Sequence, residues 1–297
     1  MFLENYNGTH TRAFLMSLKK VVLLLMIVLT RVGATGSHTG GEGWSLSASG
    51  EFGTITSLKT TFQIGRTGTE FDLDEAFDRE FDLSQRFKRF MVGLDYFHKH
   101  IIDFAYQPFS FEARDFLAVG ILLQNAGNRD SLVLEPGQAV SLKLDAPMFQ
   151  IGYLYDFTKN EGPWDLGLGL RVTSRATSVS IGNADSLYVN RSRRLILPLV
   201  KGMARYRFTD VWWTAVYADA IYAPLDWLVG NDVEASVFDI SGRVGAAFRE
   251  SLDVFLNVRY YGFAIAGARD SELGDGTLYL ENRTRFISWT LGISYRT

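Results

Sequence analysis

Apolar and polar residues alternate with a period of two over most of the chain beyond residue 50. The clearest run begins at Leu252 (LDVFLNVRY): it is apolar at every even position as far as Tyr260 and polar at Asp253, Asn257 and Arg259. Because successive side chains of a β-strand point to opposite faces, this run predicts a strand with one apolar and one polar face. Helical periodicity is nearly absent from the same part of the chain, so we expect an all-β protein.

Runs of this kind predict about ten strands that follow one another along the chain. An acidic stretch at 70–85 is expected to form a loop, with room for a short helix. The alternation changes phase at Ala146-Pro147, which predicts a β-bulge because proline cannot donate to a strand ladder. The expected strands are 57–66, 87–97, 99–111, 138–158, 163–182, 193–209, 211–223, 233–250, 252–268 and 283–296.

The connections between these strands alternate in length, because loops of about nine to 24 residues alternate with turns of about two to six. An even number of antiparallel strands with short turns at one end and long loops at the other is typical of bacterial outer-membrane barrels. We therefore expect a transmembrane up-and-down β-barrel of ten strands, with eight or twelve as alternatives. Its apolar faces would contact lipid, and both termini would lie on the periplasmic side. A soluble, lipocalin-like barrel is the competing interpretation.

Aromatic residues flank the expected short turns. Amphipathic rings gather at the headgroup level of a membrane, so this grouping predicts an aromatic girdle on the periplasmic side. The residues of the expected girdle are Tyr96, Phe157, Trp164, Tyr206, Phe208, Trp212, Trp213 and Phe248.

The N-terminal region predicts export. The apolar run at 21–29 is too short to span a bilayer, follows Lys19 and Lys20, and precedes small residues that end at Ala34. Residues 1–34 are therefore expected to be an upstream extension plus a signal peptide, with Met16 as the start and cleavage after Ala34; an uncleaved anchor is the alternative. Residues 35–49 would be a flexible leader, and 50–297 the outer-membrane barrel. Cleavage would change the net charge from −3 to −6, which does not fit a nucleic-acid-binding protein.

The chain resembles the small outer-membrane β-barrel proteins of bacteria, broadly the OmpW/OmpX-like class. The resemblance rests on the signal KKVVLLLMIVLTRVGA, the serial hairpins and the last strand, RFISWTLGISYRT. Such proteins usually end in an aromatic residue, whereas this chain ends in Thr297. The segments YQPFSFE (106–112) and LPLVKG (197–202) are similar to uncharacterised barrels of this group. The resemblance implies a monomer in outer-membrane lipid that the barrel-assembly machinery inserts.

Charged residues on the polar faces are expected to point into the barrel. A narrow barrel has little free interior, and buried charges need partners, so we expect a plug of paired charges and a surface-exposed structural or interaction role. A narrow pore or binding barrel for small, possibly anionic, solutes is the alternative. The expected lumen residues are Asp95, Asp103, Lys143, Asp145, Arg171, Arg175, Lys201, Arg205, Arg207, Asp219, Asp239, Arg243, Asp253 and Arg259.

Catalysis is the third possibility, and the sequence offers little for it. The chain has no Cys, no Gly-x-Ser-x-Gly elbow and no HExxH motif. His98 and His100 fall at an expected periplasmic turn, and His38 falls in the leader. The acidic residues of 70–85 lack the spacing of an EF-hand. We therefore expect no enzyme activity, no metal site and no cofactor.

Overall fold

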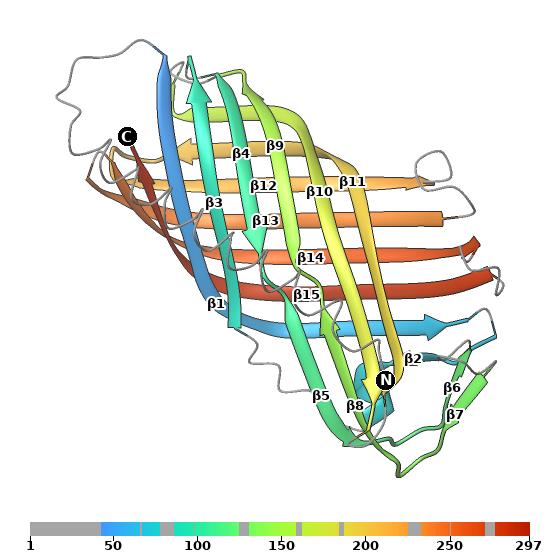
Figure 1. Cartoon of the computed structure of the whole chain (residues 1–297). Helices are drawn as coiled ribbons and strands as arrows, with labels where there is room; N and C mark the ends of the chain where they lie inside the picture. The colour runs from blue at the N-terminus through green and yellow to red at the C-terminus, as the bar shows by residue number, and fades with distance from the viewer. Residues whose placement is uncertain are drawn as a thin grey trace, which may run out of the picture.

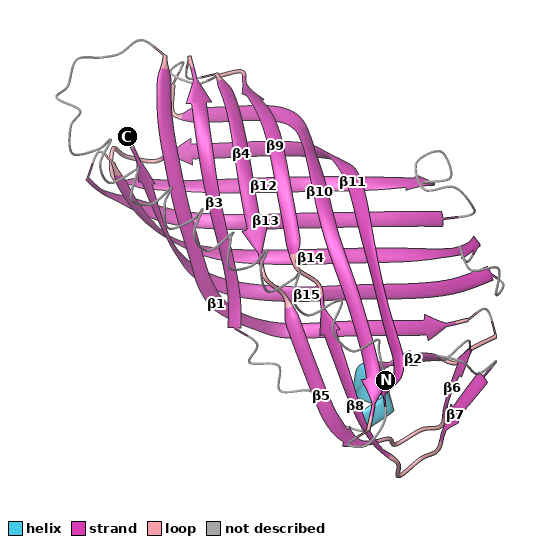
Figure 2. Ribbon diagram, in the orientation of Figure 1, coloured by secondary structure: helices cyan, strands magenta, loops and turns pink. Residues whose placement is uncertain are grey.

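Strands make up most of the computed structural model (Figures 1 and 2). The expected signal peptide, the first part of the leader and residues 78–85 lie outside the described residues. The structure describes residues 43–65, 67–77, 86–97, 99–124, 131–158, 162–183, 187–224, 233–249, 251–270 and 277–297.

Ten antiparallel strands form a closed ring, as the sequence predicts. The first ring strand, β1 (Trp44–Ile64), pairs with the last, β15 (Thr277–Arg296), and every other ring strand pairs with its two neighbours. The closure leaves no free edge in the ring. Between β1 and β15 the ring consists of β3 (Arg86–Tyr96), β4 (His100–Gln107), β9 (Met148–Asp156), β10 (Trp164–Gly182), β11 (Leu187–Arg207), β12 (Trp212–Pro224), β13 (Val233–Arg249) and β14 (Leu252–Asp270).

Further short elements lie at one end of the ring. The strands β5 (Ser110–Phe116) and β8 (Ala139–Asp145) pair with each other, and β8 also pairs with the far part of β10. The helix α2 (Leu73–Phe77) falls in the acidic stretch where a short helix was expected. No helix in the described part of the chain is long and apolar enough to cross a membrane. The remaining strands are β2 (Glu70–Asp72), which pairs with β1, and β6 (Ile121–Gln124) and β7 (Ser131–Leu134), which pair with each other.

The barrel has two different ends, which we call the turn end and the loop end. The short connections β3–β4, β9–β10, β11–β12 and β13–β14 lie at the turn end, and the other connections lie at the loop end. The backbone N–H of Thr297 donates to the carbonyl of Leu46 over 2.9 Å, so β1 starts and the chain finishes at the turn end.

Several boundaries differ from expectation; among them, β15 begins at Thr277 and not at 283, and the expected strand 99–111 is divided into β4 and β5. β1 begins at Trp44, so residues 44–49 belong to the barrel and not to a flexible leader. This part of the strand consists mostly of small Ser, Ala and Gly residues, so it lacks the apolar alternation by which strands were predicted. β11 begins at Leu187, which leaves only four residues after Gly182 where a longer loop was expected. β8 ends just before Pro147 and β9 begins just after it, so the chain has two separate strands here and not one strand with the expected β-bulge.

The two halves of the barrel have opposite polarity. In the half next to the turn end, which we call the turn half, apolar side chains point outward: Leu256 on β14 is 65% exposed, whereas its neighbours Asn257 and Arg259 are buried. In the half next to the loop end, the loop half, β14 instead buries Phe263 and Ile265. A lipid-facing belt explains the first arrangement, and water outside the barrel explains the second.

The interior of the loop half is a continuous apolar core. It includes Phe62 of β1, Leu197 of β11, Phe263 of β14 and side chains of α2, β5 and β8. A register shift between Ile55 and Ser57 marks a β-bulge in β1, where the core begins. Before the bulge the odd-numbered residues of β1 point inward, and beyond it the even-numbered residues do. The bulge thereby turns the apolar residues of the second part of β1 toward the core.

Candidate functional site: the charged interior and its cavity

A set of paired charges crosses the interior of the turn half. We call it the ion layer, and its side chains come from eight of the ten ring strands, which the alternation of each strand turns inward. Each member is buried, so its charge is compensated by other members and not by bulk water. The ion layer consists of Glu51, Arg89, Asp103, Arg171, Lys201, Asp219, Asp239, Arg243 and Arg259.

Arg259 is one of two members with 0% of their surface exposed, the other being Glu51. Its Nε donates to Asp239 Oδ1 over 2.6 Å, and its two terminal nitrogens donate to Asp239 Oδ2 and to Gln107 Oε1. Phe87 and Tyr261 each place a ring 5.6 Å from its guanidinium carbon. A guanidinium held by a bidentate carboxylate and two rings is fixed in position.

Arg171 joins two carboxylates on opposite sides of the interior. One terminal nitrogen lies 2.7 Å from Asp103 Oδ1, and the other donates to Asp219. The ammonium of Lys201 pairs with the second oxygen of Asp103. These contacts connect β4, β10, β11 and β12, so the charges also fix the barrel wall.

Glu51 of β1 accepts hydrogen bonds from three donors on the nearby strands β13, β14 and β15. Its carboxylate oxygens accept hydrogen bonds from Arg243 and from Asn257, each over 2.7 Å, and from the hydroxyl of Thr290 over 3.2 Å. The guanidinium of Arg243 also lies 4.5 Å from the ring centroid of Tyr217. Both carboxylate oxygens of Glu51 therefore have hydrogen-bond partners in the barrel interior.

Several of these partners were not among the expected lumen residues. Glu51 was missed because the first strand was expected to begin after it. Arg89, which donates to Gln150 over 3.0 Å, lies on a strand whose alternation was not assigned to faces. Gln107 adjoins Pro108, at the end of β4, where the strand pattern stops. The apolar residues Phe90, Val92 and Leu94 occupy the other face of β3, and this alternation was the available signal for an inward Arg89.

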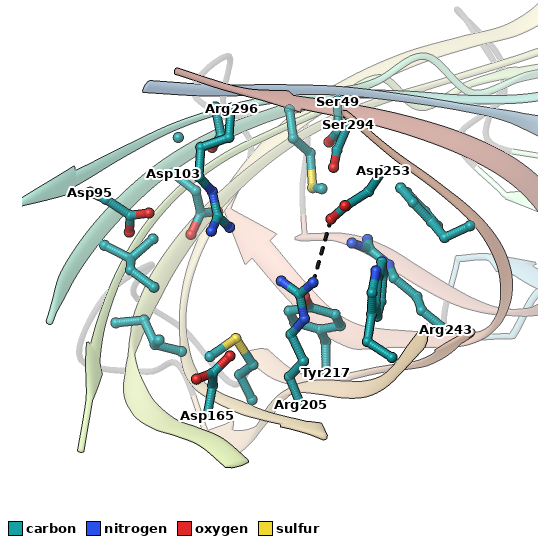
Figure 3. Close-up of a pocket in the computed structure, with 18 of the residues that line it drawn as sticks. Ser49, Asp95, Asp103, Asp165, Arg205, Tyr217, Arg243, Asp253, Ser294 and Arg296 are labelled. Carbon is teal, nitrogen blue, oxygen red and sulfur yellow. Dashed lines mark hydrogen bonds and ion pairs between the residues drawn. The ribbon is translucent and has the colours of Figure 1, made fainter. Parts of the chain in front are cut away.

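A cavity of about 470 Å³, lined by charged and apolar side chains, lies between the ion layer and the turn end. In Figure 3, Asp95, Asp103 and Asp165 lie on one side of it, and Arg205 and Arg243 lie on the other. Arg205 and Asp253 face each other across 3.4 Å within it. Residues of the short turns, among them Asp210 and Ser251, also line it, so the cavity opens toward the turn end.

Most of the expected lumen residues do lie inside the barrel, but two do not. Lys143 and Asp145 of β8 point outward, where they pair with each other over 3.1 Å, and the Lys143 side chain is 50% exposed. Leu142 and Leu144 point inward instead. The expectation was wrong because β8 lies beyond the belt, where the outside is polar. The inward residues are Asp95, Asp103, Arg171, Arg175, Lys201, Arg205, Asp219, Asp239, Arg243, Asp253 and Arg259, with Arg207 half-exposed beside Asp165 at the turn end.

The expected aromatic girdle surrounds the turn end with one exception. Trp213 is only 5% exposed and points inward, where Arg205 lies 4.3 Å from its ring. Trp212, the adjacent residue, takes the outward position. The outward members are Tyr96, Phe157, Trp164, Tyr206, Phe208, Trp212 and Phe248, and Trp44 and Phe97 extend the girdle.

The described histidine at the turn end has a simple partner. His100 Nδ1 lies 2.8 Å from the hydroxyl of Tyr153, close to the membrane-facing surface, while His98 and His38 lie outside the described residues. Within the described ranges, no three His, Asp or Glu side chains gather as metal ligands. The absence of a metal, a cofactor and an enzyme activity stays a prediction.

Known proteins resemble this chain in fold. No model of a known family and no curated protein matches it. The outer membrane protease OmpT from Escherichia coli is 13% identical, with a TM-score of 0.47 over 89% of this chain and 99% of that chain. Ail of Yersinia pestis, an attachment invasion locus protein, is 10% identical, with a TM-score of 0.32 over 86% and 99%. OprG from Pseudomonas aeruginosa is 9% identical, with a TM-score of 0.31 over 86% and 96%. Likenesses this distant carry no activity over to this chain.

Proposed function

We propose that this protein is a sealed barrel of the bacterial outer membrane with a structural or interaction role at the cell surface, and not a channel. The observation that carries the proposal is the position of Arg259, which is fully buried, bonded to Asp239 on the adjacent strand β13, and bonded across the interior to Gln107 on β4. A solute that enters from the turn end meets this layer at the floor of the cavity.

The apolar core supports the same proposal from the loop end. Beside Gln107 and Arg175, next to the ion layer, the interior has a void of only about 10 Å³, which is about the space of one water. Arg175 itself lies 4.1 Å from the ring of Phe263, at the boundary of the core. Two different kinds of packing, ionic and apolar, therefore close the barrel in series.

The outward belt supports the membrane assignment. Leu168, Leu170 and Val172 of β10 are exposed, and so are Leu291 and Trp289 of β15, although all of them are large apolar residues. A soluble protein rarely exposes so continuous an apolar band. Short turns with an aromatic girdle at one end agree with an outer-membrane orientation in which the loop end faces the cell exterior.

Conductance across a planar bilayer tests the sealed barrel. The refolded wild-type protein is expected to give no stable openings at either polarity, provided that heat-modifiable migration on a gel shows it to be folded. The variant Arg259→Ala is also expected to stay closed, because the apolar core remains. Regular openings in wild type would contradict the proposal. Openings that appear in Arg259→Ala alone would support a lumen sealed by Arg259 and would contradict a second closure by the apolar core.

A binding barrel for small solutes is the second candidate, favoured by the cavity at the turn end. Its mixed lining suits a small ligand that carries both charges or an anion directed at Arg205 and Arg243. Titration with inorganic phosphate and with glycine, followed by calorimetry on wild type and Arg205→Ala, tests this candidate. Saturable heat that Arg205→Ala removes would support a ligand site, and equal small heats in both proteins would contradict it.

A further inference from the structure

One guanidinium of the ion layer, that of Arg89 on β3, has no carboxylate partner in the described part of the chain. Arg175 has none there either, but its guanidinium carbon lies 4.1 Å from the ring centroid of Phe263. Arg89 makes neither kind of contact within the described residues, although only 4% of its surface is exposed. A buried charge without a counterpart is costly. The other buried cations each pair with a carboxylate: Arg171, Lys201, Arg243 and Arg259.

The partner that Arg89 does have is neutral and holds the guanidinium from one side. Nη2 of Arg89 donates to Gln150 Oε1 over 3.0 Å, and the amide nitrogen of Gln150 donates in turn to the hydroxyl of Thr173 over 3.2 Å. Gln150 and Thr173 are both 2% exposed, so the amide oxygen stays directed at Arg89. Nη1 of Arg89 makes no hydrogen bond to any described residue. Because Arg89 also lines the cavity at the turn end, a small solute there can reach the guanidinium.

The nearest carboxylates of the ion layer already serve other cations. Glu51 is the register partner of Arg89 across the β1–β3 pair, but one of its oxygens accepts from Arg243 over 2.7 Å, and no ion pair joins it to Arg89. Asp239 uses both of its oxygens for Arg259. The ion layer as a whole contains five cations and four carboxylates, which leaves one positive charge without a counterpart.

The other buried carboxylates of the described residues lie too far away or have partners of their own. Asp95 lies on the same strand as Arg89 but six residues closer to the turn end, which is about 20 Å along a strand. Asp156 ends β9 at the turn end, Asp165 forms an ion pair there, and Glu281 forms one on β15. A solute anion can supply the negative charge that these side chains do not.

We propose that the ion layer binds one small monovalent anion, such as chloride, at Arg89 on the floor of the cavity. One negative charge balances the layer, and the unbonded Nη1 donates to it. The hydroxyls of Ser49 and Ser241 line the same cavity and are available as further donors. A bulky or divalent anion fits less well, because the carboxylates of Asp219 and Asp239 also line the cavity. The inference goes beyond the sealed-barrel proposal, since it rests on the charges of the interior and not on the closure of the lumen.

The line width of the chloride NMR resonance, recorded with the folded barrel in detergent, tests the proposal. Wild type is expected to broaden the resonance, and added bromide is expected to reverse the broadening by competition. Arg89→Gln removes the cation and should abolish the broadening, whereas Arg89→Lys keeps the charge and should retain part of it. Arg296→Gln is the matched control, because Arg296 lines the same cavity but is exposed at the turn end. This control is expected to broaden the resonance as wild type does.

Urea unfolding at constant ionic strength gives a second measurement, with sodium isethionate, a bulky sulfonate, in place of sodium chloride. Chloride at about nine times its dissociation constant is expected to lower the unfolding equilibrium constant of wild type about tenfold, and to leave that of Arg89→Gln unchanged. Without chloride, Arg89→Gln is expected to be at least as stable as wild type, because the substitution removes a charge that lacks a counterpart.

Four outcomes decide the proposal. Equal chloride broadening by wild type and Arg89→Gln would overturn it, and so would an equal loss in Arg296→Gln, which would show a general attraction at the mouth of the cavity. A strong loss of stability in chloride-free Arg89→Gln would mean that the protein itself compensates the charge of Arg89, and would also overturn it. A wild-type barrel that conducts and still binds chloride through Arg89 would contradict the sealed lumen while supporting the anion site.

Discussion

The turn half and the loop half of this barrel are built from the same strands with opposite polarity. In the turn half of β14, the apolar Leu256 and Val258 face outward and Arg259 faces inward. In the loop half of the same strand, the small Ala264 faces outward and the apolar Phe263 faces inward. The backbone is a continuous strand across the change. The comparison teaches that the solvent outside the barrel decides what its inside contains: lipid outside requires polar groups inside, and water outside permits an apolar core.

The largest effect should come from breaking the ion layer. Arg259→Ala leaves Asp239 buried without its main partner, and we expect a loss of about 3–5 kcal/mol in the free energy of unfolding. Urea unfolding of the folded barrel, followed by tryptophan fluorescence, measures this loss. The double variant Arg259→Met/Asp239→Leu removes both charges and is expected to recover most of it. A double variant as unstable as the single one would show that the pair itself, and not the uncompensated carboxylate, holds the turn half together.

The apolar core should be nearly as sensitive to truncation. Leu142 of β8 is 1% exposed and belongs to the apolar core of the loop half. Leu142→Ala is expected to cost about 2–5 kcal/mol, because it removes methyl groups and leaves a cavity. The same urea titration detects the loss. A change below about 1 kcal/mol would mean that the β5–β8 extension is not part of the cooperative barrel.

A charge placed on the outer surface should distinguish the halves directly. Leu256→Arg puts a guanidinium into the belt and is expected to cost about 2–4 kcal/mol in lipid vesicles. Ser236→Arg, an outward substitution on β13 beyond the belt, is expected to cost about 0–1 kcal/mol. Equal costs for the two variants would argue against a lipid boundary between these positions.

The smallest effect is expected for the outward pair of β8. Lys143 and Asp145 pair at the surface of the loop half, where water screens their attraction. Lys143→Ala should therefore change the free energy of unfolding by no more than about 1 kcal/mol, in contrast to Leu142→Ala at the adjacent position. A loss as large as that of Arg259→Ala would mean that Lys143 points into the interior after all.

The sequence predicts the ring well because its evidence is local. Alternation around Leu252 and short turns such as the one after Arg249 depend on neighbouring residues, and they lead to ten strands and to an inward Arg259. Glu51 was missed because this local signal is absent before it: the small residues Ser47, Ala48 and Ser49 show no apolar alternation.

The direction of a face is not local, and there the prediction was wrong. The residues of β8 alternate as clearly as those of β14, but alternation alone does not say whether lipid or water lies outside. Lys143 and Asp145 were placed in the lumen by analogy with the belt strands, and the actual choice depends on the height of β8 above the belt. Trp213 shows the same limit of local evidence. Trp212 and Trp213 are adjacent on one strand, so only one of the two can face outward, and the sequence does not say which.

The seam between β1 and β15 has a consequence for how the protein reaches this state. The two strands are separated by more than two hundred residues of chain, and their pairing runs from Ser47 with Arg296 to Ile64 with Leu280. Pairings between such distant segments form slowly, because a long loop must close before any contact compensates for its entropy. Without the β1–β15 pairing, the ring would be an open sheet with two unprotected edges. The rate of seam closure therefore sets how long the chain is exposed to aggregation.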